Sequence, residues 1–196
     1  MQVLACLWRP LVVGMAAVFF LSGTAGAQTV PLPERMAQCG GCHGEDGNSR
    51  LEKIPSLAGQ PEFFILNQLF LMREGVRQVE PMMQFVKDLK DEEMNALAGH
   101  YSKLVPKPTD EKIDAAWAKG GEELAGPLRC GSCHLPDLSG QQQMPRLAKQ
   151  RVDYLIHSLK EYRDNTRSGS DTLMNNVVAG LSDADLAALA HYSASK

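Results

Sequence analysis

The sequence predicts an all-α protein made of two tandem helical units. A stretch of sequence recurs about 90 residues downstream, apolar residues repeat at helical spacing, and no segment alternates like a half-buried strand between hairpin turns. The 196 residues are 44% hydrophobic and 22% charged, as in soluble globular proteins. This composition excludes wholesale disorder and a multispan membrane protein. The net charge of −3 gives no basic surface for nucleic acid.

Residues 1–27 form a separate N-terminal segment. They contain one charged residue, Arg9, followed by an apolar run from Leu11 to Leu21 and the small residues Ala25-Gly26-Ala27. A membrane-spanning helix needs about 20 apolar residues, so the run is short for that role. The pattern predicts a secretory signal peptide cleaved after Ala27, with an uncleaved anchor as the alternative.

The remainder of the chain is an imperfect repeat. Cys39-Gly40-Gly41-Cys42-His43 returns 91 residues later as Cys130-Gly131-Ser132-Cys133-His134. The segment Pro55-Ser56-Leu57-Ala58-Gly59-Gln60 returns as Pro145-Arg146-Leu147-Ala148-Lys149-Gln150. Two copies with this period predict tandem small domains, because a solenoid needs three or more short repeats.

The joint between the copies is predicted at Leu104-Val105-Pro106-Lys107-Pro108-Thr109. Its two prolines rule out a continuous helix and favour an extended strap. We therefore predict one domain over residues 28–105 and a second over 106–196. At this size, hydrophobic burial alone gives marginal stability.

Each copy shows helical patterns. Pro61 suits a first helical turn, and residues 63–72 are apolar on nearly all sides, which predicts a buried helix. Residues 92–104 place their apolar side chains on one face, and a matching helix starts at Ser182 with a capping box. Residues 110–124 form another helical stretch that leads into the second cysteine motif.

The doubled Cys-x-x-Cys-His motif indicates covalent haem attachment. Two thiols add across the vinyl groups of the porphyrin, and the adjacent histidine becomes the proximal iron ligand. The sequence therefore predicts two covalently bound haem c groups, one on Cys39, Cys42 and His43 and the other on Cys130, Cys133 and His134. The porphyrins would supply the apolar centres that such small, aromatic-poor units need.

Other readings of the cysteines explain less of the pattern. A redox dithiol favours a strand-rich, thioredoxin-like setting, which the sequence lacks. A four-cysteine zinc site would have to join pairs from different repeats. A disulfide accounts for the cysteines but leaves the recurring histidine unexplained.

Met82 and Met174 are the predicted sixth ligands of the two irons. Each stands seven residues before a matching leucine, Leu89 or Leu181, ahead of the last helix of its copy. Met83 is the alternative in the first copy, and ordinary packing is the alternative for both. His100, His157 and His191 have no partner histidine at the matching repeat position.

In these motifs the chain resembles the class I cytochromes c, and in particular the tandem dihaem cytochromes of the c4 type. The resemblance spans residues 33–194, including the two haem motifs, the Pro-x-Leu-Ala-x-Gln segments and the last helix ending near Tyr192. It implies two class I cytochrome c domains, each a small helical bundle around a covalent haem. It also implies that the carbonyls of Pro55 and Pro145 accept hydrogen bonds from the proximal histidines. Leu135 departs from the pattern, because glycine follows the haem histidine in the family.

Two arginine pairs recur in both copies and suit carboxylates, including haem propionates. The alternative for them is a solvated helix end. The four residues are Arg73, Arg77, Arg163 and Arg167.

These features lead us to expect a periplasmic electron carrier that is not an enzyme. The expected donors are a dehydrogenase or a quinol-oxidising complex, and the expected acceptor is an oxidase or reductase. Peripheral association with the membrane is compatible with this role. The alternative is an electron-transfer cytochrome subunit of a periplasmic dehydrogenase. A dihaem enzyme is disfavoured, because it needs an open or unusually ligated haem.

Overall fold

The computed structural model describes residues 30–169 and 172–196, and within these ranges the regular structure is helical. The predicted signal peptide and its cleavage site lie outside the described residues. No helix in these ranges is long and apolar enough to cross a membrane. The helices are α1 (Leu32–His43), α2 (Glu62–Arg73), α3 (Met83–Val86), α4 (Asp91–Ser102), α5 (Ala115–Ala125), α6 (Cys130–His134), α7 (Val152–Arg163), α8 (Thr172–Val178) and α9 (Asp183–Ser195).

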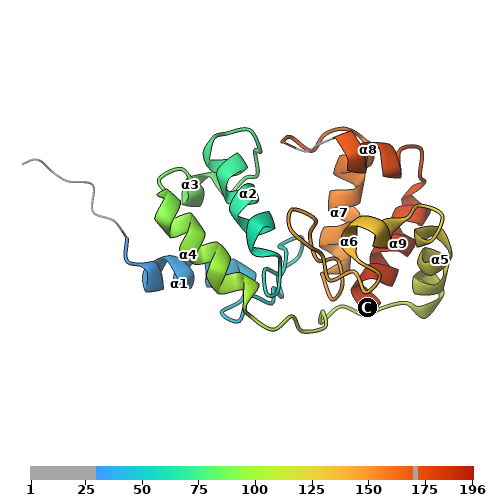
Figure 1. The fold of residues 1–196 in the computed structure, drawn as a ribbon. Helices are drawn as coiled ribbons and strands as arrows, with labels where there is room; N and C mark the ends of the chain where they lie inside the picture. The colour runs from blue at the N-terminus through green and yellow to red at the C-terminus, as the bar shows by residue number, and fades with distance from the viewer. Residues whose placement is uncertain (1–29, 170–171) are drawn as a thin grey trace, which may run out of the picture.

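The helices form two units that lie side by side (Figure 1), which confirms the predicted two-unit, all-α fold. The first unit contains α1 to α4 and the second contains α5 to α9. The linker between them, residues 103–114, carries no helix, as Pro106 and Pro108 require, and runs along one edge of both units (Figure 1).

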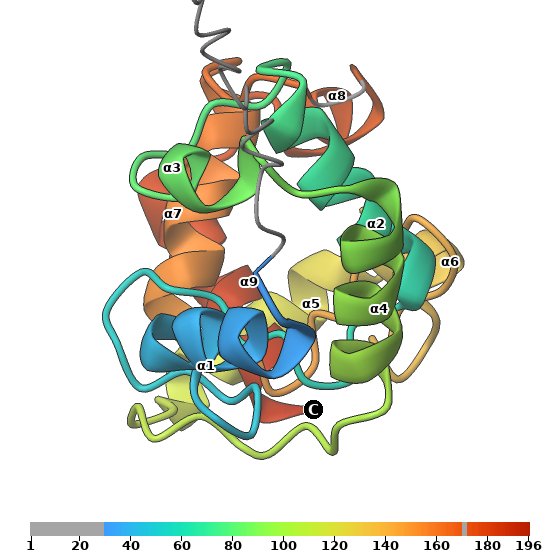
Figure 2. The ribbon, with the colours of Figure 1, turned by 90° about the vertical axis from the view of Figure 1, so that its left-hand side faces the viewer.

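The core of the first unit lies where α2 and α4 pack together. Figure 2 faces this unit, with α1 at its foot, α3 above α1, and α2 and α4 to one side. The predicted inner face of α4 is buried, since Met94 and Leu97 are each only 2% exposed. The cluster of buried apolar residues comprises Ile65, Met72, Val86, Leu89, Met94, Leu97, Ala98 and Tyr101.

The second unit is built on α9, which packs against α5 and α7. Gly121 of α5 lies so close to α9 that a Cβ atom there would collide with the carbonyl oxygen of Ala188. The missing side chain therefore lets the two helix backbones approach each other. The predicted inner face of α9 is buried and comprises Leu186, Leu189 and Ala190.

Two expectations from the sequence differ from the structure. Helix α2 is not buried all round, because Phe63 and Phe70 are 51% and 46% exposed while Ile65 and Met72 are buried. Only one face of α2 packs on the core. The helix expected from residue 110 starts at Ala115, because the carboxylate of Asp114 accepts hydrogen bonds from the first-turn amides and ends the preceding extended segment.

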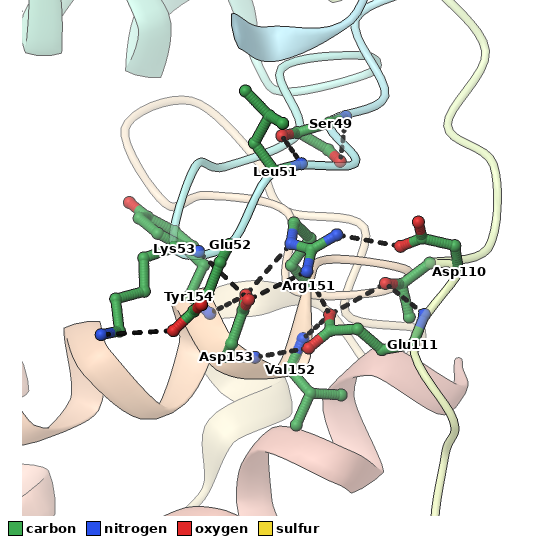
Figure 3. Close-up of polar contacts among 12 residues, drawn as sticks. Ser49, Leu51, Glu52, Lys53, Asp110, Glu111, Arg151, Val152, Asp153 and Tyr154 are labelled. Atoms are coloured by element: carbon green, nitrogen blue, oxygen red, sulfur yellow. Dashed lines mark hydrogen bonds and ion pairs between the residues drawn. The ribbon is translucent and has the colours of Figure 1, made fainter.

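Polar contacts around Arg151 join the linker to the start of α7, and the start of α7 to the first unit (Figure 3). The guanidinium of Arg151 pairs with Asp110 of the linker and with Asp153, both at 2.9 Å. Asp153 also accepts a hydrogen bond from the backbone N–H of Lys53 in the first unit at 3.1 Å. Glu111 of the linker accepts from the first two amides of α7, so the linker caps that helix.

Candidate haem-binding sites

Both cysteine motifs lie on helical turns. Cys39, Cys42 and His43 form the end of α1, and Cys130, Cys133 and His134 form α6. Residues three apart on a helix share one face, so both sulfurs and the following imidazole can approach one planar ligand. The four cysteines carry no disulfide, and each is at least partly exposed.

The two imidazoles are buried and held in the same way. His43 is 6% exposed and His134 is 4% exposed. In both, Nδ1 lies 2.8 Å from a proline carbonyl, that of Pro55 for His43 and that of Pro145 for His134. A carbonyl can only accept, so Nδ1 carries the proton and Nε2 keeps its lone pair. Burial lowers the pKa of both histidines, which keeps the rings neutral and suited to bind a metal.

The remaining imidazole nitrogen fits a haem iron. Nε2 of His134 is buried and has no hydrogen-bond partner among the described residues, as expected for an atom that coordinates a metal. Burial raises the pKa of the thiols of Cys39 and Cys130, which disfavours a reactive dithiol. In the described ranges no three side chains of the His, Cys, Asp or Glu type group to hold a lone metal ion. The residues present therefore fit covalent haem.

The predicted sixth ligands precede the last helix of each unit. Met82 directly precedes α3 and Met174 lies within α8. Both side chains are partly buried, and Met82 packs against the apolar cluster of the first unit, as does its neighbour Met83. The geometry does not separate Met82 from Met83, so the sixth ligands remain a prediction.

Three of the four arginines bind carboxylates of the protein, and two of the three do so at matching positions of the repeat. Arg73 pairs with Asp91 at 2.7 Å, and Arg163 makes the matching pair with Asp183 at 2.6 Å. Each guanidinium also pairs with the acidic residue that follows it in sequence. These contacts fasten the end of α2 to α4 and the end of α7 to α9.

The other two arginines meet at a tyrosine between the units. The guanidinium groups of Arg77 in the first unit and Arg167 in the second both lie near the phenol of Tyr154. Burial raises the pKa of Tyr154, but the two guanidinium groups outweigh it and lower the pKa to about 8. Arg167 also pairs with Glu161 at 2.8 Å. The positive charge gathered here suits an added carboxylate.

Three buried polar residues near the sites were not predicted from the sequence. Gln60 and Gln150 are 4% and 2% exposed and cross the boundary between the units, and Arg146 is 3% exposed beside them. Burial lowers the pKa of Arg146 to about 10, and its Nη2 has no partner among the described residues. The repeated Pro-x-Leu-Ala-x-Gln segment carried the signal for both glutamines, since a buried amide must find partners.

Known proteins match the chain over most of its length. It is 31% identical to cytochrome c4 of Pseudomonas aeruginosa over 191 residues, covering 93% of each chain. It is 32% identical to a protein of Thiomonas intermedia named thiosulfate dehydrogenase electron acceptor, covering 94% of this chain and 90% of the relative. The structure of reduced cytochrome c4 from Pseudomonas stutzeri superposes with a TM-score of 0.73 at 32% identity, over 84% of this chain and 97% of that one.

The family assignment combines this similarity with the geometry. The Cytochrome c family model matches residues 118–195, which span most of the second unit. Both units present the haem motif and the buried imidazole that the cofactor requires, and haem c supplies reversible one-electron chemistry when bound. The chain is therefore a member of the cytochrome c4 family, a dihaem electron-transfer cytochrome with two covalently bound haem c groups.

Proposed function

We propose that the protein carries electrons in the periplasm from a respiratory donor, either a dehydrogenase or a quinol-oxidising complex, to a terminal oxidase or reductase, and transforms no substrate itself. The observation that supports this most is the pair of buried, neutral imidazoles, His43 and His134, each held by a proline carbonyl. A rigid proximal ligand changes little between the two oxidation states of an iron, which suits fast electron transfer.

The proposal includes a methionine on the other side of each iron, Met82 in the first unit and Met174 in the second. A thioether raises the reduction potential and leaves no open position for a substrate. Both residues are partly buried and precede the last helix of their unit. Loss of either thioether should lower the potential of that haem and open a site for carbon monoxide.

Substitution of the methionines tests this ligation. Met82→Ala and Met174→Ala should each remove about half of the near-infrared sulfur-to-iron charge-transfer absorption of the oxidised protein. Met83→Ala is the matched control and should leave this absorption intact. If Met83→Ala removes half and Met82→Ala none, then Met83 is the ligand in the first unit. If none of the three variants changes the absorption, then the His/Met carrier proposal is wrong.

The second candidate function is that of a dedicated electron acceptor for a periplasmic dehydrogenase. It is supported by the Thiomonas intermedia relative, whose name makes it the electron acceptor of thiosulfate dehydrogenase. Stopped-flow reduction of the dihaem protein by a purified thiosulfate dehydrogenase and by a quinol-oxidising complex would separate the two roles. Faster reduction by the dehydrogenase at physiological salt would favour the dedicated role.

Export and haem contacts complete the proposal. Cleavage after Ala27 would leave Gln28 as the first residue of the periplasmic protein, and peptide mapping of that protein's N-terminus would test it. Arg77 suits a haem propionate better than the other three arginines, because Arg73, Arg163 and Arg167 each already pair with a carboxylate of the protein. We place the domain boundary between residues 105 and 106, within the extended linker.

A further inference from the structure

Two glutamines join the units through a reciprocal pair of hydrogen-bonded clamps. The side-chain oxygen of Gln150 accepts from Ser56 N at 2.8 Å, and its nitrogen donates to Ser56 O at 2.9 Å. The oxygen of Gln60 accepts from Arg146 N at 2.9 Å, and its nitrogen donates to Arg146 O at 3.0 Å. All four residues are buried, so water does not compete for these bonds.

Each clamp acts on the peptide group that holds a proximal histidine. Pro55 O and Ser56 N belong to one peptide group, whose oxygen lies 2.8 Å from Nδ1 of His43 and whose N–H donates to Gln150. The peptide between Pro145 and Arg146 joins His134 to Gln60 in the same way. A single rigid peptide plane therefore separates each imidazole from an amide of the other unit.

The connection is crossed between the units. The side-chain amide linked to His43 is that of Gln150 in the second unit, and the one linked to His134 is that of Gln60 in the first. Hydrogen bonds in a chain polarise one another, so a peptide that donates through its N–H accepts more strongly through its oxygen. A stronger acceptor at Nδ1 makes the imidazole a more basic ligand, which favours Fe(III) and lowers the reduction potential.

We propose that Gln60 and Gln150 are positioning residues that tune the haem of the opposite unit through the proximal histidine. Gln150 lowers the potential of the first haem, and Gln60 lowers that of the second. The interface between the units thereby takes part in setting both potentials.

Replacement of each glutamine by leucine tests the proposal, because leucine keeps most of the volume and removes both hydrogen bonds to the opposite unit. Gln150→Leu also removes the bond that Gln150 Oε1 accepts from Arg151 N within its own unit. Gln150→Leu should raise the reduction equilibrium constant of the first haem by up to about tenfold, or about 59 mV for one electron, and leave the second unchanged. Gln60→Leu should do the reverse. Redox titration followed by NMR gives the two potentials separately, with haem signals assigned through their links to Cys39 and Cys130.

A second measurement follows the imidazole itself. The Nδ1 proton of His43 should exchange faster with solvent in Gln150→Leu, and that of His134 should not. Gln150→Glu is the rescue variant, because it keeps an acceptor for Ser56 N and should retain slow exchange at His43; it also serves if the leucine variant fails to fold. Ser168→Ala is the matched control, since Ser168 accepts from Gln78 N across the same interface without a link to either histidine.

Several outcomes would overturn the proposal. They are a shift confined to the haem of the substituted unit, equal shifts of both haems, no shift at all, or a Ser168→Ala effect as large as that of the glutamine variants. A leucine variant that shifts the potential of the opposite haem without changing exchange at its histidine would also contradict the route through the peptide.

Discussion

The two units reach the same haem motif by different routes. In the first unit, the 12-residue helix α1 runs without interruption into Cys39, Cys42 and His43. In the second, α5 ends at Ala125, and the motif stands on the separate five-residue helix α6. Arg129, directly before α6, adopts a positive φ of 57° that turns the chain. The comparison shows that haem attachment requires one helical turn, whereas the structure of the preceding segment can differ.

The units also differ in the apolar cluster that supports the site. The first has a continuous cluster of eight buried residues drawn from α2, α4 and the segment between them. The second has a continuous cluster of Val152, Leu155, Ala190 and Ala194, and its other buried apolar residues, among them Leu138, Val178 and Leu186, do not belong to that cluster. Polar contacts around Arg151 and the close crossing of α5 and α9 complete the second unit. We infer that the second unit depends more on its porphyrin.

Removal of one haem at a time would test this inference and should have the largest effect. Cys39→Ala/Cys42→Ala and Cys130→Ala/Cys133→Ala should each lower the protein mass by one haem in mass spectrometry. The second double variant should lose more helical circular dichroism and become more sensitive to proteolysis within its altered unit, because its buried apolar residues do not form one continuous cluster without the porphyrin. Equal losses, or a larger loss in the first double variant, would contradict the inferred difference.

The residue after each haem histidine offers a finer comparison. Gly44 follows His43 with φ 84° and ψ 139°, and Leu135 follows His134 with φ 68° and ψ 156°. This region of backbone space suits glycine, and a leucine held there is strained by roughly 1–3 kcal/mol. A Cβ atom at Gly44 would also collide with the carbonyl oxygen of Asn48.

Exchanging the residue types should therefore change the free energies of unfolding of the two units in opposite directions. Leu135→Gly should raise the free energy of unfolding of the second unit by about 1 kcal/mol, after the entropy of the added glycine is subtracted. Gly44→Ala should lower that of the first unit by about 2 kcal/mol or more, since collision and strain add. Denaturant unfolding of the haem-bound protein, followed by circular dichroism, measures both. A Leu135→Gly variant that unfolds more easily would refute strain at that position.

The features that could be predicted from the sequence are those that depend on residues close together in the chain. The haem motif, the capping box at Ser182 and the inner faces of α4 and α9 are written in contiguous or periodic residues, and the structure has them. The exposed faces of α2 and the late start of α5 depend on what packs nearby. The clamps of Gln60 and Gln150 depend on how two units face each other, which a repeat does not specify. Met82 and Met83 stay unresolved because both pack on the same cluster.

The smallest expected difference lies at the start of the last helix of each unit. In α9, Ser182 N donates to Asp185 Oδ2 at 2.9 Å, and Asp185 N donates to Ser182 Oγ at 3.1 Å, a complete capping box. In α4 the equivalent residue is Lys90, whose N–H donates to Glu93 Oε2 at 2.9 Å. A lysine side chain cannot accept a hydrogen bond, so only half of the box forms.

Two reciprocal substitutions would measure how much the serine half of the capping box contributes to stability. Ser182→Ala should destabilise the second unit by about 1 kcal/mol, and Lys90→Ser should stabilise the first by about 0.5–1 kcal/mol. The pH dependence provides the check on mechanism. Hydrogen bonds from Ser182 hold the pKa of Asp185 below its usual value of about 3.9, so the box is intact above about pH 4 and is lost as the pH falls further. In Ser182→Ala, NMR titration should find the Asp185 pKa back near its usual value. An unchanged Asp185 pKa would mean that the serine contributes nothing to the cap, and the contrast between the two helix starts would then have no energetic consequence.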